Sequence, residues 1–197
     1  TFIVSLGLAF FIRHSKLEHW RWLIYLDVLF WIFLAPIWIA RGVLLRRWVK
    51  ACIGITLLLP FSVSLVLLRD LSPWILLRYM AVFWVSDTFA YFSGRIFGHH
   101  KLAPQTSPGK TWEGVAGGMI AVTIYAIIVT PQFLMNFQFY GMLAMAVIGI
   151  IGDLFESMIK RQAGVKDSGR LLPGHGGILD RLDSQIAALP LALLLIR

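Results

Sequence analysis

Charge and cysteine are both scarce in this sequence of 197 residues. Only 14% of the residues are charged and 58% are hydrophobic, whereas an ordinary soluble domain has roughly 25% and 45–50%. This composition excludes a disordered chain, a nucleic-acid-binding domain and an ordinary water-soluble enzyme, and it leaves an integral membrane protein. The single cysteine, Cys52, excludes an internal disulfide framework and a cysteine-rich metal site.

Long apolar runs dominate what remains. A membrane-spanning helix needs about 20 mostly apolar residues, and candidate runs lie at about 1–12, 22–40, 51–68, 73–92, 114–130, 139–155 and 180–196. The runs are continuously apolar and do not alternate with period two, which argues against a β-barrel. We therefore expect an all-α fold, a polytopic transmembrane helical bundle of about seven spans.

The basic residues indicate how the bundle is oriented. They gather in the polar segments 41–50, 93–113 and 153–181, which lie on one side of the membrane if the chain crosses seven times. The positive-inside rule makes that side the cytoplasm. The net charge of +8 is then explained by cytoplasmic loops and lipid headgroups rather than by nucleic acid. Arg13, Lys16 and Arg21 fit less well, so either the first run is not a full crossing or 13–21 lies in the interface.

Two aspartates lie inside apolar runs, where a carboxylate is costly and usually functional. Asp87 is followed by Tyr91 at i+4 and Gly94 at i+7, which gives one polar, small-residue helix face. We interpret Asp87 as functional, with a helix-packing hydrogen bond as the alternative. Asp27 has no polar companions nearby, and we interpret it as structural.

Half of the acidic residues fall near the C-terminal end, on either side of a glycine-rich segment. They are Asp153, Glu156, Asp167, Asp180 and Asp183. One helical face carries Asp153, Glu156, Ser157 and Lys160, because these residues follow the spacing i, i+3, i+4 and i+7. Asp180, Asp183 and Ser184 repeat the start of that spacing on the last apolar run. Two helices with carboxylates are therefore expected to meet at the same membrane face.

This mixture of residues suits phosphate chemistry. Mg²⁺ binds one or two carboxylates together with substrate phosphates, Lys and Arg bind phosphate directly, and glycine lets backbone amides approach it. A Mg²⁺-dependent phosphoryl or nucleotidyl transfer needs all three. The alternative is an ordinary charged loop held by salt bridges, but such a loop does not need Gly174, Gly176 and Gly177 around His175.

The segment 98–114 adds a further phosphate candidate. It contains Gly-Lys-Thr, but the glycine that a Walker A loop requires five residues earlier is Pro104. Ser107, Lys110 and Thr111 instead precede a helix that starts near Glu113, which is consistent with an anion-binding helix entrance or with a simple turn. The histidines show no metal-ligand spacing, so zinc is not expected.

Residues 157–184 resemble the signature of the phosphatidate cytidylyltransferases, or CDP-diacylglycerol synthases, of bacterial type. The matching positions are Ser157, Lys160, Arg161, Lys166, Asp167, His175, Gly176, Gly177, Asp180, Arg181 and Asp183. The family also carries an Asp followed by Tyr and Gly, the pattern Ser-Pro-x-Lys-Thr-x-x-Gly and a Gly-Asp pair. Here these are Asp87 with Tyr91 and Gly94, residues 107–114, and Gly152 with Asp153. The resemblance covers about residues 80–197.

The resemblance implies that CTP and phosphatidate react to give CDP-diacylglycerol and pyrophosphate. It implies a catalytic transmembrane region at 71–197 with cytoplasmic loops 93–113 and 153–181, preceded by N-terminal spans at 1–70 that we expect to be truncated. It also implies a homodimer in the bacterial inner membrane with its active site facing the cytoplasm, and no nucleic-acid partner.

Roles for individual residues follow from the chemistry and the resemblance together. Asp153 and Asp180 flank the loop on adjoining helices and are the first choices as metal ligands; the resemblance suggests the same pair, with Mg²⁺ and K⁺ as a possible second cation. Asp87 and Glu156 are further metal candidates. The residues expected to hold the triphosphate are Lys160, Arg161, Lys166 and Arg181. Further substrate contacts are expected from Ser107, Lys110, Thr111, Asp167, Gly176, Gly177 and Asp183. His175 would donate to a phosphate oxygen or order the loop; it is not needed as a general base, because the phosphatidate nucleophile is already an anion.

Two alternatives stay open. A CTP-dependent membrane lipid kinase would share the loops and the metal but attack the γ-phosphate, and the full signature argues against it. A transporter of an anionic substrate would place charges near the bilayer midplane in broken or repeated helices. Here the charged clusters lie at helix ends and no repeat is visible.

Overall fold

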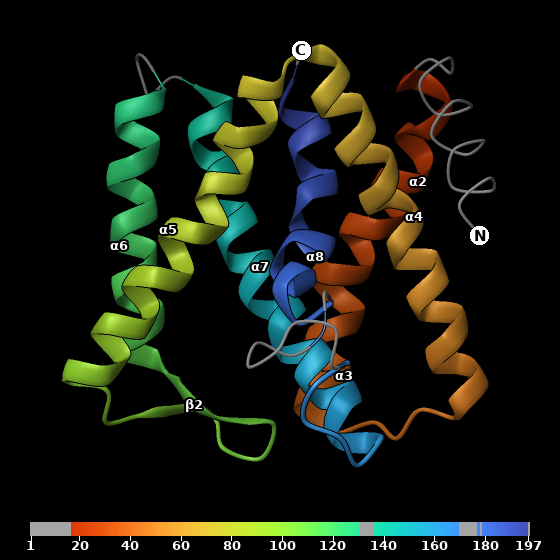
Figure 1. The fold of residues 1–197 in the computed structure, drawn as a ribbon, viewed down its shortest axis with the longest axis vertical. Helices are drawn as coiled ribbons and strands as arrows, with labels where there is room; N and C mark the ends of the chain where they lie inside the picture. Colours follow the sequence, from red (N-terminus) through yellow and green to blue (C-terminus); the bar gives the residue numbers. More distant parts are fainter. Residues whose placement is uncertain (1–16, 131–135, 170–176, 178, 197) are drawn as a thin grey trace.

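The computed structural model describes residues 17–130, 136–169, 177 and 179–196. The elements in chain order are α2 (Leu17–Leu29), η1 (Phe30–Leu34), α3 (Ala35–Arg41), α4 (Arg47–Leu71), α5 (Pro73–Phe97), β1 (Lys101–Ala103), β2 (Ser107–Thr111), α6 (Trp112–Val129), α7 (Phe137–Gln162) and α8 (Leu179–Leu195). The helices lie side by side along the long axis, and the two strands project from one end (Figure 1). The short π-helix η1 joins α2 to α3 without interrupting the path of the chain.

Four of the described helical segments are long and apolar enough to cross a membrane: Trp20–Arg41, Trp48–Leu71, Trp112–Val129 and Phe137–Gln162. The helical membrane class is therefore confirmed, but the expected count of about seven spans is not. The predicted runs 73–92 and 180–196 do form helices, α5 and α8. However, α5 carries three charged side chains, Arg78, Asp87 and Arg95, and α8 has only 17 residues, with charges in its first two turns. The predicted run 1–12 lies outside the described residues.

Local signals in the sequence explain where the helices begin and end. Three helices start at a side chain that accepts a hydrogen bond from a first-turn N–H: Ser72 for α5, Thr111 for α6 and Asn136 for α7. Pro73 at the first position of α5 has the backbone angle that a helix start requires. Gly42 ends α3 in the left-handed conformation, with φ of 58°.

Small residues bring α5 and α6 into close contact. Ser86, Ala90 and Gly94 on α5 lie against Gly114 and Gly118 on α6. A Cβ on Gly114 would lie 2.8 Å from the carbonyl oxygen of Ala90, and one on Gly118 would lie 2.9 Å from that of Ser86. Small residues spaced four apart allow helices to approach in this way when water cannot drive their association.

A similar close approach joins α7 to α8 in the middle of the bundle. A Cβ on Gly152 would lie 2.4 Å from the Cβ of Ala187, and the carbonyl oxygen of Asp183 lies 3.0 Å from the same position. Met145 and Leu189 are completely buried in the surrounding core. Gly152 therefore allows Asp183 on α8 to lie beside Asp153, the next residue on α7.

A short antiparallel hairpin accompanies the helices, and the fold remains of the expected all-α class. Strands β1 and β2 pair Lys101 with Thr111 and Ala103 with Ser107. The segment was expected to be part of the cytoplasmic loop 93–113, and β2 contains Pro108 and Gly109, which are poor strand formers. The hairpin is closed at its base by Trp112, whose N–H donates to the carbonyl of His100 at 3.0 Å.

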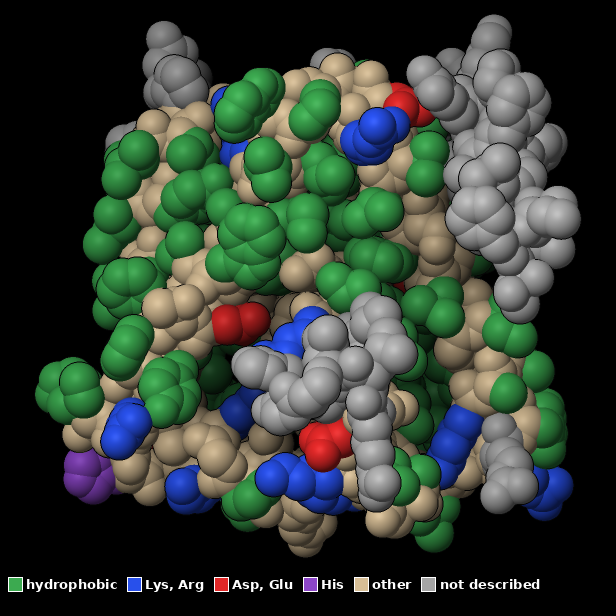
Figure 2. Space-filling model, in the orientation of Figure 1, with side chains coloured by type: hydrophobic (Ala, Val, Ile, Leu, Met, Phe, Trp, Pro, Cys, Tyr) green, Lys and Arg blue, Asp and Glu red, His purple; other side chains and the backbone are tan. Residues whose placement is uncertain are grey.

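The hairpin, the end of α3, the start of α4 and the end of α7 lie at the same end of the bundle, and α8 begins in the same half (Figure 1). The segments 41–50, 93–113 and 153–181 were predicted to share one side, and their described parts do. In the view of Figure 2, basic side chains gather along this end, whereas hydrophobic side chains cover most of the surface above it. A bundle with one charged end and an apolar body is the shape expected of a membrane protein.

Candidate active site

A pocket of about 440 Å³ opens near the charged end of the bundle. Its wall is built from the C-terminal half of α5, the hairpin strand β2, the start of α6 and the middle of α7. The charged side chains that line it are Asp87 and Arg95 from α5, Lys110 from β2 and Asp153 from α7. The close contact between α5 and α6 positions one side of this wall, and the hairpin positions another.

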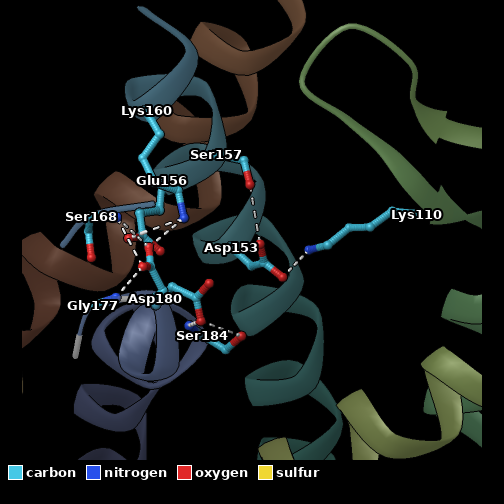
Figure 3. A network of polar contacts seen from close by, with 10 residues as sticks. Lys110, Asp153, Glu156, Ser157, Lys160, Ser168, Gly177, Asp180 and Ser184 are labelled. Atoms are coloured by element: carbon cyan, nitrogen blue, oxygen red, sulfur yellow. Dashed lines mark hydrogen bonds and ion pairs between the residues drawn. The ribbon is translucent and has the colours of Figure 1, made fainter. Parts of the chain in front are cut away.

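Lys110 and Asp153 form an ion pair across the pocket wall. Both side chains are half-buried. On its other oxygen, Asp153 accepts a hydrogen bond from the hydroxyl of Ser157, at 3.5 Å, one turn further along α7. Figure 3 shows Asp153 between these two partners. The pair thus joins the hairpin to α7 at the border of the pocket.

A second polar cluster lies beside the pocket, where α7 meets the start of α8. The Lys160 amine lies 2.8 Å from an oxygen of Asp180 and 3.5 Å from an oxygen of Glu156. Asp180 also accepts hydrogen bonds from the N–H of Ser168, at 2.9 Å, and of Gly177, at 2.7 Å (Figure 3). Asp180 therefore ties the segment after α7 to the first turn of α8.

The hydrogen bonds change the ionisation of Asp180, which lies outside the four candidate spans. Burial by itself raises the pKa of this carboxyl. The hydrogen bonds from Lys160, Gly177 and Ser168 outweigh that effect and hold the pKa well below its usual range. Asp180 is therefore an anion at any physiological pH.

Negative charge exceeds positive charge in this region. Both carboxylate oxygens of Glu156 are buried and accept no hydrogen bond from the described residues. Asp183 is close enough to interact electrostatically with Glu156 and Asp153, and Asp87 interacts with Asp153 and Asp183. Buried carboxylates without sufficient partners are unstable unless a cation or a proton joins them.

This donor set fits a hard cation such as Mg²⁺, because all of its ligands would be oxygens. Within the described parts of the chain, no three His, Cys, Asp or Glu side chains already form a metal-binding group. Mg²⁺ does not require such a group, because it keeps several waters and is commonly bound by one or two carboxylates together with substrate phosphates.

A sequence model of the cytidylyltransferase family matches residues 1–197. The chain belongs to this family. It is 43% identical to a phosphatidate cytidylyltransferase of Pseudomonas aeruginosa over 151 residues, which cover 73% of this chain and 56% of that protein. It is 48% identical to one of Haemophilus influenzae over 125 residues, 59% of this chain and 43% of that protein. The chain thus spans about half the length of the curated relatives it matches. The family resemblance of the signature is confirmed, and these relatives give no support to a lipid kinase or a transporter.

Most of the residues predicted for the site in this cytidylyltransferase-family chain are brought together. Those that line the pocket or the adjoining cluster are Asp87, Ser107, Lys110, Thr111, Asp153, Glu156, Lys160, Gly177, Asp180 and Asp183. The hydroxyl of Thr111 is buried and accepts a hydrogen bond from the N–H of Gly114, so its first role is to cap α6. Its hydrogen can still be donated to a bound phosphate.

The remaining predicted residues lie at the edge of the cluster. Arg161 is exposed, and its Nε donates to the carbonyl of Thr106 in the hairpin turn at 3.5 Å. Lys166, Asp167 and Arg181 are exposed as well. The predicted residues His175 and Gly176 lie outside the described residues. The roles predicted for all of these side chains stay predictions.

Two features of the site were not predicted. The first is Arg95, which lines the pocket. It follows Tyr91 by one helical turn and Asp87 by two, and this spacing could have indicated that the three residues share a helix face. Gln162 joins α7 to the loop before α4: its amide nitrogen donates to the carbonyl of Val43 at 2.8 Å, and its oxygen accepts from the N–H of Leu45 at 3.1 Å. No sequence pattern indicates the contact between Gln162 and the loop before α4, because the two segments are more than a hundred residues apart in the sequence.

Proposed function

We propose that this chain transfers the cytidylyl group of CTP to phosphatidate and so forms CDP-diacylglycerol and pyrophosphate. The observation that carries the proposal is the position of Asp153 and Lys110. Both line the pocket, and Asp153 also adjoins the carboxylate cluster of α7 and α8. Groups suited to binding phosphate and groups suited to binding a cation therefore meet at one border, as transfer between two phosphate compounds requires. The similarity to phosphatidate cytidylyltransferases supports the same reaction.

The chemistry needs little from a general base. A phosphate oxygen of phosphatidate attacks the α-phosphorus of CTP and forms the new phosphorus–oxygen bond. The bond from the α-phosphorus to the oxygen that bridges to the β-phosphorus breaks, and pyrophosphate leaves with that electron pair. The nucleophile is already an anion, so the main demand on the protein is to hold two crowded anions in line and to balance their charge.

The residues of the chain can meet that demand. Lys110 and Lys160 would contact phosphate oxygens, with Arg161, Lys166 and Arg181 at the edge. Asp153, Asp180, Glu156 and Asp87 are the side chains that would hold Mg²⁺, with K⁺ as a possible second cation. Of these, Glu156 has both oxygens without hydrogen bonds, whereas those of Asp180 are engaged by Lys160, Ser168 and Gly177. When bound, Mg²⁺ neutralises phosphate oxygens and orients the leaving pyrophosphate.

The same proposal includes the setting of the enzyme. CTP is water-soluble, whereas phosphatidate stays in the bilayer. The site therefore belongs at the charged end of the bundle, on the cytoplasmic side of the inner membrane. The basic side chains at that end support this orientation. A homodimer is part of the proposal on the strength of the family resemblance alone.

The position of a radioactive label tests the reaction. The protein in detergent micelles is incubated with phosphatidate, Mg²⁺ and CTP labelled at either the α- or the γ-phosphorus. Cytidylyl transfer puts the α-label into lipid and the γ-label into pyrophosphate. A lipid kinase would put the γ-label into lipid, and that result would contradict the proposal. No label in lipid from a folded protein would also contradict it.

A pair of variants connects the reaction to the site. Asp153→Asn removes a carboxylate at the border of the pocket and should reduce transfer of the α-label by about 100-fold or more, the usual scale for loss of one charge-stabilising group. Asp70→Asn is the control, because Asp70 pairs with Arg69 in the last turn of α4, at the other end of the bundle. If both variants keep full activity, the reaction does not take place at this site.

A further inference from the structure

Arg95 is the pocket's second basic side chain, and its position is set by Tyr91. The guanidinium donates a hydrogen bond to the Tyr91 hydroxyl at 2.9 Å, and its carbon lies 6.0 Å from the centre of the Tyr91 ring. Both residues line the pocket, one turn apart on α5. A planar guanidinium that is held against an aromatic ring loses less freedom when it binds a ligand than a free side chain would.

The charge of Arg95 is not neutralised within the described structure. No carboxylate there lies within ion-pair distance of it, and its one hydrogen bond, to Tyr91, leaves other N–H groups available. Lys110 differs, because it is already paired with Asp153. Arg95 is therefore the pocket cation that is ready to receive an anion, and the fork of its N–H groups matches two oxygens of a phosphate.

The surroundings of Arg95 favour a lipid over a soluble anion. The same stretch of α5, together with the start of α6, exposes large apolar side chains: Phe89, Phe92, Ile96, Phe97 and Trp112. In a bilayer such side chains contact acyl chains. The cluster of Lys160 and Asp180, in contrast, adjoins the polar segment 163–169, which is mostly exposed. The surroundings of the site thus differ in polarity on either side of Asp153: the side of α5 and α6 is apolar, and the side of Lys160 and Asp180 is polar.

We propose that Arg95, positioned by Tyr91, binds the phosphate monoester of the lipid acceptor, and that the pocket between α5, α6 and β2 is the acceptor subsite. This inference rests on the proposed function and refines it, because it leaves the cluster around Lys160 and Asp180 to the nucleotide. The acceptor phosphate would then meet the nucleotide beside Lys110 and Asp153. A lipid phosphate, an inorganic phosphate and a nucleotide share the same anionic chemistry, so the test must separate them.

Binding is measured first, without CTP. The purified full chain in neutral detergent micelles is titrated by thermophoresis with phosphatidate, with diacylglycerol and with inorganic phosphate. We expect phosphatidate to bind, diacylglycerol to bind at least about 10-fold more weakly, and inorganic phosphate to compete only at much higher concentration, because one lost charge-assisted contact changes affinity by about 10- to 100-fold. Equal binding of phosphatidate and diacylglycerol would overturn the inference.

Three variants then test whether Arg95 is the residue that binds the lipid phosphate. Arg95→Ala should weaken phosphatidate binding about 10- to 100-fold, and Tyr91→Phe, which keeps the ring and removes the hydroxyl, should weaken it less. Arg46→Ala is the matched control: Arg46 is an exposed cation at the same end of the bundle but not in the pocket wall. If Arg95→Ala and Arg46→Ala have the same small effect, Arg95 only adds to the general positive charge and the inference is wrong.

Kinetics separate this inference from the proposed function. With the α-labelled CTP assay, Arg95→Ala should raise the KM for phosphatidate about 10-fold or more and leave the KM for CTP unchanged. A residue that merely anchors α5 at the interface would not change one KM alone. Activity with an unchanged KM for phosphatidate, or a raised KM for CTP, would overturn the inference while the proposed function stands. Arg95-dependent binding without any transfer would overturn the proposed function instead.

Discussion

Lys110 and Asp153 are joined by an ion pair although they come from β2 and α7, elements far apart in the sequence. The contact brings the Ser-Pro-Gly-Lys-Thr segment beside the helix that carries Asp153, Glu156 and Lys160. It explains how two separate polar segments form one site. It also means that the hairpin is held to the bundle by a group that the reaction would need, so binding of phosphate at Lys110 is expected to alter the hairpin's attachment.

Replacing Lys110 by Met should therefore abolish most activity. The change leaves Asp153 without its cation and removes a phosphate contact, and a loss of about 100-fold in kcat/KM is expected. Initial rates of CDP-diacylglycerol formation measure it. The control is Lys101→Met, because Lys101 is an exposed lysine on the neighbouring strand β1. Similar losses in both variants would show that the hairpin's net charge matters rather than the ion pair.

Replacing Glu156 by Gln should change stability and activity in opposite directions. Burial and the neighbouring Asp183 disfavour the charged form of this side chain in metal-free protein. An amide, which needs no proton to be neutral, should therefore be more stable there. In EDTA the melting temperature should rise by about 2–4 °C, which corresponds to about 1 kcal/mol for a chain of this size. The Mg²⁺ concentration that gives half-maximal activity should rise about 10-fold or more.

Asp70→Asn serves as the control for both measurements, since Asp70 lies at the opposite end of the bundle beside Arg69. A lower melting temperature of Glu156→Gln in EDTA would mean that the carboxylate is satisfied in the metal-free protein. An unchanged Mg²⁺ requirement would remove Glu156 from the cation site.

Asp180 should hold the segment after α7 in place down to acidic pH. Its pKa is lower in the folded protein than in the unfolded chain because Lys160, Gly177 and Ser168 donate hydrogen bonds to it. The stabilisation is therefore complete above the unfolded value, about 3.9, and is lost as the pH falls through the lower folded value. The protection factors of the Ser168 and Gly177 amides, taken against the intrinsic exchange rate at each pH, should stay high at pH 4 and fall only in stronger acid.

The amide of Thr106 is an internal control, because it donates to the backbone carbonyl of Ala103 and not to a titrating group. In Asp180→Asn the protection of Ser168 should be weaker at every pH at which Asp180 is ionised, because the charge that strengthens its hydrogen bond is lost. Protection of Ser168 that disappears near pH 5 in the unmodified protein would contradict the lowered pKa.

The contact between α5 and α6 should be sensitive to a single methyl group. Gly118→Ala places a Cβ 2.9 Å from the carbonyl oxygen of Ser86, so a backbone must shift, and a cost of about 1–3 kcal/mol is expected from such overpacking. Gly54→Ala is the matched control: Gly54 also lies within a helix, α4, but nothing lies within 4 Å of its added Cβ. That variant should be neutral or slightly stabilising. Melting temperatures in detergent that fall equally in both variants would disprove the close contact.

Much of the site could be predicted because it depends on spacing within one helix. Asp153, Glu156 and Lys160 were placed on one face of α7, and the structure puts Lys160 beside Glu156 as that spacing requires. The helices at 73–92 and 180–196 were also recognised from their apolar runs. The hairpin was missed, because strands of three and five residues are too short to show an alternating pattern, and β2 contains Pro108 and Gly109.

Helical periodicity, the apolar runs and the charged segments thus determine the fold class, the common end of the charged segments and the carboxylate face of α7. These patterns depend on neighbouring residues only, because 3.6 residues per turn fix which side chains of a helix share a face. Tertiary structure alone decides that Lys110 pairs with Asp153, that Asp180 gathers Ser168 and Gly177, and that Arg95 lines the pocket. Those contacts depend on how closely helices pack at Gly114, Gly118 and Gly152, and the closeness of that packing is set by the partner surface rather than by the local sequence.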